Sequence, residues 1–331
     1  MLSESTQPVV KLFFREAIAR ALREEMGRDD TVIVLGQDVG RFGGSYKEFA
    51  GLFEQFGGAR VRDTPVAEAA MVGLGAGAAA AGMRSLVSIT YMDFLMLGLD
   101  PLVNFAAKAR FKTGGQLKVP MVVKTTAGAK GQGVAHSQCI ESWIMGVPGL
   151  KVVAPSTAAD AYGLMKSALR EAGPVVYVDH KRLFPTAGEV AVHEHTVPIG
   201  QAVVRRTGND VTIVTHSYMT RIAIECAEKL ATEDVSCEVV DLRTLAPLDM
   251  ATICASVART GALLTLEEGQ MAGGVGTEVA FRVREQLGAG PSVRVARVGA
   301  LPAPVSSNPV LEAACLPDAR DVAKAIRLLL S

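Results

Sequence analysis

The sequence has no excess of charge of either sign, because 34 Lys and Arg residues balance 34 Asp and Glu residues. A surface that binds nucleic acid or an acidic membrane usually carries a clear positive excess, so neither is indicated as a partner. The five cysteines are scattered, with no Cys-x-x-Cys pair and no histidine at zinc-ligand spacing. This pattern argues against a disulfide framework or a structural zinc and fits a reducing compartment.

Long apolar runs are also missing. The best candidate for a membrane span, residues 69–83, has fifteen residues and several glycines, whereas a spanning helix needs about 20 apolar residues. Residues 1–11 contain neither an apolar secretory core nor an arginine-rich amphipathic presequence. We therefore expect a soluble, cytoplasmic protein without a membrane partner.

The sequence does contain enough apolar residues for a large core, at 49% of the chain and a mean hydropathy of +0.27. A chain of 331 residues favours two domains. Apolar segments separated by helices predict an α/β domain over residues 1–185, with a parallel sheet covered on both faces. We predict its helices over residues 13–26, 93–112 and 157–170, and its strands over residues 31–35, 86–89, 121–124, 151–154 and 175–178.

Residues 186–199 contain Pro, Gly and His and are predicted to form a strand-poor linker. The alternating pattern restarts after this linker, so residues 200–331 are predicted to form a second, smaller α/β domain. Its expected strands cover residues 211–215, 237–242, 263–266 and 293–298, and its expected helices cover residues 221–231, 249–259, 272–286 and 318–330.

A single acid stands at the start of an apolar helix in the first domain. The segment Asp63-Thr64-Pro65-Val66-Ala67-Glu68 is followed by an Ala/Gly-rich run with no charge before Arg84. An acid in a first helical turn interacts favourably with the helix dipole and with free backbone N–H groups, by less than about 1 kcal/mol. Glu68 is explained either by this effect or by a buried ligand beside its carboxylate.

Two glycine clusters could be read as nucleotide sites. Gly75 and Gly77 fit a loose dinucleotide pattern, but they lie inside a helix rather than in a turn after a strand. Gly73, Gly77 and Ala81 recur every four residues, which favours close helix packing across a subunit interface. Residues 273–276 follow a predicted strand and form either a nucleotide turn or an ordinary helix-opening turn.

Residues 128–138 form a glycine-rich segment that contains His136 directly after a predicted strand. Histidine exchanges protons near neutral pH, so His136 is either a loop residue or a catalyst. The other histidines, His180, His193, His195 and His216, have no such context.

These segments together resemble the beta subunit of thiamine-diphosphate-dependent 2-oxo acid dehydrogenases of the pyruvate, branched-chain and acetoin type. The resemblance covers nearly the whole chain and implies a transketolase-like pyrimidine-binding domain followed by a transketolase C-terminal-like domain. It is carried by residues 15–18, 36–40, 43–44, 63–70, 136–138, 148–156, 241–249, 302–304 and 316–318.

The resemblance also implies roles for particular residues. Glu68 would hydrogen-bond the aminopyrimidine ring of thiamine diphosphate, with Val66, Thr90 and Phe94 around that ring. His136 would help to bind the 2-oxo acid and to acylate a lipoyl group reductively. Main-chain oxygens would hold a structural potassium ion, and the matching positions are Met121, Ala168, Leu169, Glu171 and Gly173.

The reaction implied is the oxidative decarboxylation of a pyruvate-like 2-oxo acid, or the cleavage of acetoin, with acyl transfer to lipoamide. The chain lacks the Gly-Asp-Gly segment with which thiamine enzymes hold Mg²⁺ and the diphosphate. An alpha subunit in an α2β2 heterotetramer would supply them, and a lipoyl-bearing acyltransferase would be the next partner. Val134 and Ala135 look more like the pyruvate and acetoin branches.

Two alternatives remain open from the sequence. Half of a split transketolase would keep Glu68 but would act on sugars and ignore lipoamide. A non-catalytic nucleotide-binding module would use the turn at residues 273–276 and would not need Glu68.

Overall fold

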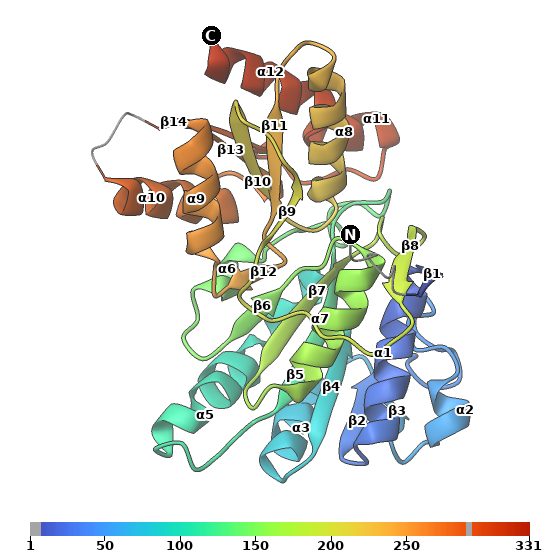
Figure 1. The fold of residues 1–331 in the computed structure, drawn as a ribbon. Coiled ribbons are helices and arrows are strands. Elements are labelled where there is room, and N and C mark those ends of the chain that lie inside the picture. The colour runs from blue at the N-terminus through green and yellow to red at the C-terminus, as the bar shows by residue number, and fades with distance from the viewer. Residues whose placement is uncertain (1–7, 289–292) are drawn as a thin grey trace, which may run out of the picture.

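The computed structural model describes residues 8–288 and 293–331. Within these residues the strands form a seven-stranded sheet, a five-stranded sheet and a two-stranded sheet. In Figure 1 the first half of the chain, in blue to green, lies below the second half, in yellow to red. The first seven residues of the predicted first domain lie outside the described part.

The seven-stranded sheet has the order β12-β6-β7-β5-β4-β2-β3. Apart from β12, its strands pair in parallel, and most of their residues are buried, as the continuous apolar segments predict. The strands are β2 (Val32–Gly36), β3 (Val61–Asp63), β4 (Arg84–Ile89), β5 (Met121–Ala127), β6 (Lys151–Val153), β7 (Val175–His180) and β12 (Thr244–Ala246).

Helices cover both faces of this sheet. Helices α1 (Phe14–Arg28) and α7 (Ala158–Arg170) pack together over one face, and α3 (Glu68–Ala80) lies over the other. The helix predicted over residues 93–112 is divided into α4 (Met92–Leu95), the 3₁₀ turn η1 (Met96–Gly98), the π turn η2 (Asp100–Ala106) and α5 (Ala107–Lys112). Pro101 accounts for part of this irregularity, because it has no N–H to donate and its ring crowds the preceding turn. Two short helices are α2 (Leu52–Phe56) and α6 (Ser142–Met145).

The five-stranded sheet has the order β14-β13-β10-β11-β9, with β9 as an antiparallel edge strand. Helices α8 and α12 pack together, as do α9 and α10. The predicted strands and helices of the second half are all present. They are β10 (Val211–Thr215), α8 (Met219–Ala231), β11 (Cys237–Asp241), α9 (Met250–Thr260), β13 (Ala262–Gln270), α10 (Val275–Leu287), β14 (Arg294–Ala300) and α12 (Ala319–Leu330). The structure adds two elements that the sequence analysis did not predict, β9 (Val203–Arg206) and α11 (Pro309–Cys315).

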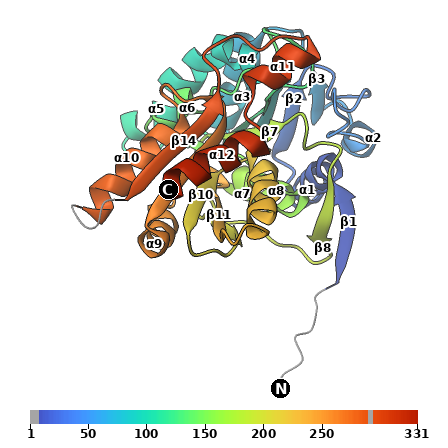
Figure 2. The ribbon, with the colours of Figure 1, turned by 90° about the horizontal axis from the view of Figure 1, so that it is seen from above.

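The prediction that residues 186–199 are poor in strand is wrong. This segment contains β8 (Ala187–Ala191), which pairs with β1 (Val9–Phe13) in an antiparallel ladder. Figure 2 shows β1 and β8 side by side, apart from the two large sheets. The chain therefore leaves its first half through a strand that is anchored to the start of the same half.

The two halves are joined by backbone and by charge. Strand β12 comes from the second half but pairs with β6 of the first sheet. Arg205 in β9 forms ion pairs with Asp160 in α7 and with Asp241, and Arg243 also reaches Asp160 at 3.4 Å. Because Asp160 is buried, its pairs with Arg205 and Arg243 link the halves where water screens charge least.

Helix α3 has two different faces. A Cβ atom on Gly75 would collide with Val87 of β4, whereas a Cβ atom on Gly77 would meet nothing within 4 Å. The sequence Gly73, Gly77 and Ala81 therefore marks the side turned away from the sheet, and its role in a subunit interface stays a prediction. Among the described helices, this one included, we find none with the length and hydropathy needed to traverse a bilayer.

Candidate functional site

The carboxyl ends of four neighbouring parallel strands meet at one edge of the first sheet. Gln37 follows β2, Glu68 follows β3, Thr90 follows β4, and His136 lies in the loop after β5. Ligands of parallel α/β sheets commonly bind outside this edge. A cavity of about 410 Å³ lies here, lined by Gln37, Val66, Glu68, Met71, Ile89, Thr90, Tyr91, Phe94, Leu97 and His136.

The structure thus brings together the five residues that the resemblance assigns to catalysis and pyrimidine binding. The sequence patterns do not predict Gln37, Tyr91 or Leu97. Tyr91 carries a signal that could have been used, since it lies two residues after the end of an apolar strand at the ligand-binding edge.

Glu68 is the first residue of α3 and is partly buried. Its carboxylate has no hydrogen-bond or ion-pair partner among the residues that the structure describes. Ala67, at the N-cap, makes no side-chain capping bond either. Glu68 is therefore not used to cap its own helix, and both carboxylate oxygens are left for a ligand in the cavity.

Three aromatic rings also line the cavity. His136 packs edge-on against Tyr91, with ring centroids 4.6 Å apart, and against Phe94, with ring centroids 5.3 Å apart. Gln132 donates a hydrogen bond to the Tyr91 hydroxyl at 3.3 Å. Edge-to-face contacts of this kind are favoured between aromatic rings, so Tyr91 and Phe94 favour this orientation of the imidazole at the cavity.

The predicted potassium ligands overlap with a hydrogen-bonded cluster. Arg84 Nη1 donates to the carbonyl oxygens of Leu169 and Glu171, each at 2.9 Å. The carbonyl oxygen of Ala168 accepts from the Glu171 N–H at 3.3 Å. A carbonyl oxygen has two lone pairs, so each keeps one for a cation. The potassium site stays a prediction.

The turn at residues 273–276 precedes α10, and a side chain of the protein already accepts hydrogen bonds from its backbone N–H groups. The carboxylate of Glu267 accepts from the N–H groups of Val275 at 2.9 Å and of Gly276 at 3.0 Å. A phosphate at a helix start would need such free N–H groups. The helix-opening turn, rather than the nucleotide turn, is therefore the interpretation that the structure supports.

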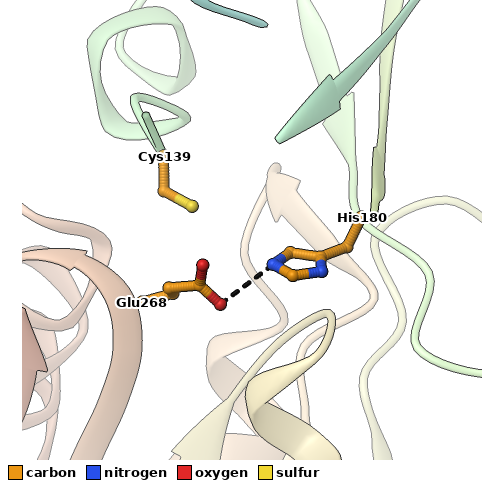
Figure 3. Close-up of side chains that lie close together, drawn as sticks. All are labelled: Cys139, His180 and Glu268. Carbon is orange, nitrogen blue, oxygen red and sulfur yellow. Dashed lines mark hydrogen bonds and ion pairs between the residues drawn. The ribbon is translucent and has the colours of Figure 1, made fainter. Parts of the chain in front are cut away.

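A second cluster of polar side chains lies between the halves, where Cys139, His180 and Glu268 approach one another (Figure 3). Their potential ligand atoms lie within 4.8 Å of one another. His180 Nδ1 accepts a hydrogen bond from the Arg182 N–H at 3.1 Å, so the ring proton is on Nε2. Nε2 then donates to Glu268 Oε2 at 2.9 Å.

This proton position argues against a metal at the cluster, because a metal at Nε2 would need the nitrogen that carries the proton. Burial raises the pKa of the Cys139 thiol well above its usual value, so the sulfur is not a thiolate. Burial opposes ionisation of Glu268, but His180 and the Ala129 N–H outweigh it and lower the pKa of this carboxyl. The cluster is a buried histidine–glutamate pair beside a neutral thiol.

Comparison with known proteins shows the class of protein to which this chain belongs. Residues 11–186 match the family model of the transketolase pyrimidine-binding domain, and residues 200–322 match that of the transketolase C-terminal domain. A solved split-gene transketolase, described as an inactive beta4 tetramer, superposes with a TM-score of 0.78 at 25% identity, over 96% of this chain and 98% of that one. The fold and the site thus define a transketolase-type chain of the thiamine diphosphate enzymes.

Curated relatives narrow the class. The beta-1 subunit of the mitochondrial pyruvate dehydrogenase E1 component of Arabidopsis thaliana is 42% identical over 94% of this chain and 87% of its own. The beta subunit of 2-oxoisovalerate dehydrogenase of Bacillus subtilis is 42% identical over 82% of this chain and 83% of its own. The chain belongs to the beta subunits of the decarboxylating E1 components of 2-oxo acid dehydrogenase complexes.

Proposed function

We propose that this chain forms the pyrimidine-binding half of a thiamine-diphosphate-dependent E1 component that decarboxylates a pyruvate-like 2-oxo acid, or cleaves acetoin, and transfers the acyl group to lipoamide. The observation that carries the proposal is the unpartnered carboxylate of Glu68 on the wall of a cavity that also contains Val66, Thr90, Phe94 and His136.

The residues present fit the aminopyrimidine part of the cofactor. A flat ring would pack against Phe94 and Val66, and Glu68 would donate or accept a proton at a ring nitrogen. When bound, thiamine diphosphate supplies the carbon nucleophile and the electron sink for decarboxylation, while the protein orients the reactants and controls protons. His136, which also lines the cavity, would hold the substrate carboxylate and exchange a proton with the acyl acceptor.

The proposed partners follow from what the site lacks. The sequence has no Gly-Asp-Gly segment for Mg²⁺ and the diphosphate, so an alpha subunit would provide them in an α2β2 heterotetramer. Val66 and Leu97, at the cavity, are 64% and 60% exposed, and apolar side chains in this state are commonly covered by a partner. A lipoyl-bearing acyltransferase would accept the acyl group, and we place the complex in the cytoplasm.

The test is reconstitution of the chain with its alpha subunit and assay against pyruvate, acetoin and 2-oxoisovalerate. We expect Glu68→Gln to lower kcat by at least about 100-fold, the range typical of a lost proton-transfer group. Glu54→Gln is the matched control, because Glu54 is also an acid in a first helical turn but lies in α2, outside the cavity. Equal activity of the two variants, or full turnover by this chain alone, would contradict the proposal.

Half of a split transketolase is the second candidate, favoured by the structural neighbour of that name. The identity of 25% to that neighbour is lower than the 42% to the E1 beta subunits. Turnover of ketose phosphates by the reconstituted pair, without lipoamide, would favour this alternative.

A further inference from the structure

We propose that Lys181 is a positioning residue that closes the loop carrying His136 and so orients the imidazole at the cavity. The effect on catalysis rests on the proposed function, whereas the closure of the loop by Lys181 does not. Lys181 directly follows β7 and is fully buried.

The ammonium group of Lys181 contacts both ends of the loop. Lys181 Nζ donates to the carbonyl oxygen of Gly128 and to the carbonyl oxygen of His136, each at 2.6 Å. The residues between these two carbonyls include an exposed stretch, Lys130 to Gln132, and the exposed pair Val134 and Ala135. One buried cation therefore joins the two ends of this loop, and its exposed stretch is also tied to α11, since the Gly131 N–H donates to Glu312 Oε2 at 2.6 Å.

Other contacts hold the neck of the same loop. The Gly128 N–H donates to the Gln138 carbonyl at 3.4 Å, and the Gln138 N–H donates to the buried carboxylate of Asp93 at 3.2 Å. Gly128 has a φ of +85°, and a Cβ atom there would collide with the His180 ring. The neck is therefore tightly packed, and among the described residues the carbonyl oxygen of His136 accepts a hydrogen bond from Lys181 alone.

Lys181 also acts on the ring that packs against His136. Its Nζ lies 5.2 Å from the centroid of Tyr91, within the range of a cation–π interaction. Tyr91 in turn contacts the His136 imidazole edge-on. The lysine thus fixes the histidine through its backbone and through its aromatic neighbour.

Burying an ammonium group is an unfavourable way to stabilise a fold if the group has no other role. Burial lowers the pKa of Lys181, which shows that its charged form is disfavoured by desolvation. An apolar side chain of similar volume is often as good or better for stability at a buried position. A charged lysine here is explained by the two carbonyl oxygens that it must hold together.

The experiment compares Lys181→Met, which keeps the length but removes the donors, with Lys181→Arg, which restores a cation and donors. Lys130→Met is the matched control, because Lys130 lies in the same loop but is exposed at its tip. In the isolated chain, we expect Lys181→Met to speed amide exchange over residues 129–137 by about tenfold or more and to shift the His136 imidazole resonances. Lys181→Arg should restore most of the protection, and Lys130→Met should behave as the wild type.

In the reconstituted enzyme, we expect Lys181→Met to lower kcat/KM for the 2-oxo acid by about 10- to 100-fold, as a misplaced catalytic group does. The apparent affinity for thiamine diphosphate should change much less, because Glu68 and Val66 come from a different segment. A purely structural role would lower both together with the melting temperature.

Unchanged exchange and resonances in a folded Lys181→Met chain would overturn the inference. If Lys181→Met does not fold, Lys181→Gln is measured in the same way, and failure of both to fold would make Lys181 a structural residue and also overturn it. If Lys181→Met opens the loop but the wild-type complex turns over no 2-oxo acid, the proposed function is contradicted and the loop closure by Lys181 stands.

Discussion

Glu16 and Glu68 look alike in the sequence, since each is an acid at the start of a helix. In the structure Glu16 accepts a hydrogen bond from the Phe13 N–H at 2.9 Å and so satisfies the backbone at the start of α1. Glu68 makes no such bond in α3. The sequence could not separate these outcomes, because they depend on the path of the chain before the helix, where Ala67 takes an unusual backbone conformation.

This difference predicts opposite responses to the same substitution. Glu16→Ala should lower the free energy of unfolding by about 1 kcal/mol, because it removes a capping hydrogen bond. Glu68→Ala should leave the stability of the isolated chain nearly unchanged, because none of the residues that the structure describes pairs with its carboxylate. Urea unfolding of both variants measures this, and an equal loss of stability would show that Glu68 does serve its own helix.

Glu141 gives a pH-dependent prediction. Burial, with Glu267 and Glu268 nearby, raises the pKa of Glu141 from 4.5 to about 7. Between these values the folded chain binds the extra proton, so stability falls as pH rises through this window. Above this pH window, the charged carboxylate of Glu141 lowers the free energy of unfolding by on the order of 3 kcal/mol.

Glu141→Gln should therefore raise the melting temperature at about pH 8, and this gain should shrink as the pH falls toward about 5. Glu285→Gln is the control, because Glu285 is exposed. Thermal melts across the pH series give the measurement. A gain in melting temperature that does not depend on pH would show that ionisation of Glu141 does not destabilise the folded chain.

At the scale of the element, two glycines of α3 differ in whether the packing of the helix requires a glycine. Gly75 lies against Val87, and Gly77, two residues further on, faces open space. Gly75→Ala should destabilise the isolated chain by about 1–3 kcal/mol through overpacking. Gly77→Ala should stabilise it by up to about 1 kcal/mol, because alanine is the better helix former. Chemical unfolding of the two variants checks the pair, and stabilisation by both would mean that α3 does not pack on β4 as closely as described.

The elements that the sequence predicts best are those with local patterns. Helix α1 and the buried strands of the parallel sheet carry continuous apolar or amphipathic segments, and they begin and end close to the predicted residues. Strands β8 and β12 are short and are defined by their partners β1 and β6, which are distant in sequence. No local pattern could reveal them, because the pairing itself makes them strands.

At the scale of the whole molecule, some residues of the candidate site could be predicted from local sequence and others could not. Glu68 and His136 could be proposed from the sequence, since each lies in a segment that resembles a known family. Tyr91 and Lys181 could not, because their roles depend on the meeting of the loops after β4, β5 and β7 at one edge of the sheet. The only local signals were the positions of Tyr91 and Lys181 close to the ends of buried strands.

Exposed apolar side chains at the cavity, Val66 and Leu97, lead to the last prediction. Helix α3 begins at the cavity with Glu68, and on the face that carries Gly77 it also exposes Leu74, which is 55% accessible. If this face packs against another subunit, a large side chain at Gly77 will block assembly without disturbing the chain itself, since its Cβ would meet nothing within 4 Å.

Gly77→Leu should therefore melt close to the wild-type temperature as an isolated chain but fail to form the complex with the alpha subunit. Gly27→Leu is the matched control, because Gly27 is also an exposed helical glycine with open space around it, and it lies in α1, away from the cavity. Analytical ultracentrifugation of each variant mixed with the alpha subunit measures the outcome. Normal assembly of Gly77→Leu would place the interface elsewhere and would leave the small residues of α3 without an explanation, whereas failure of both variants would show that bulk on any exposed helix disturbs assembly.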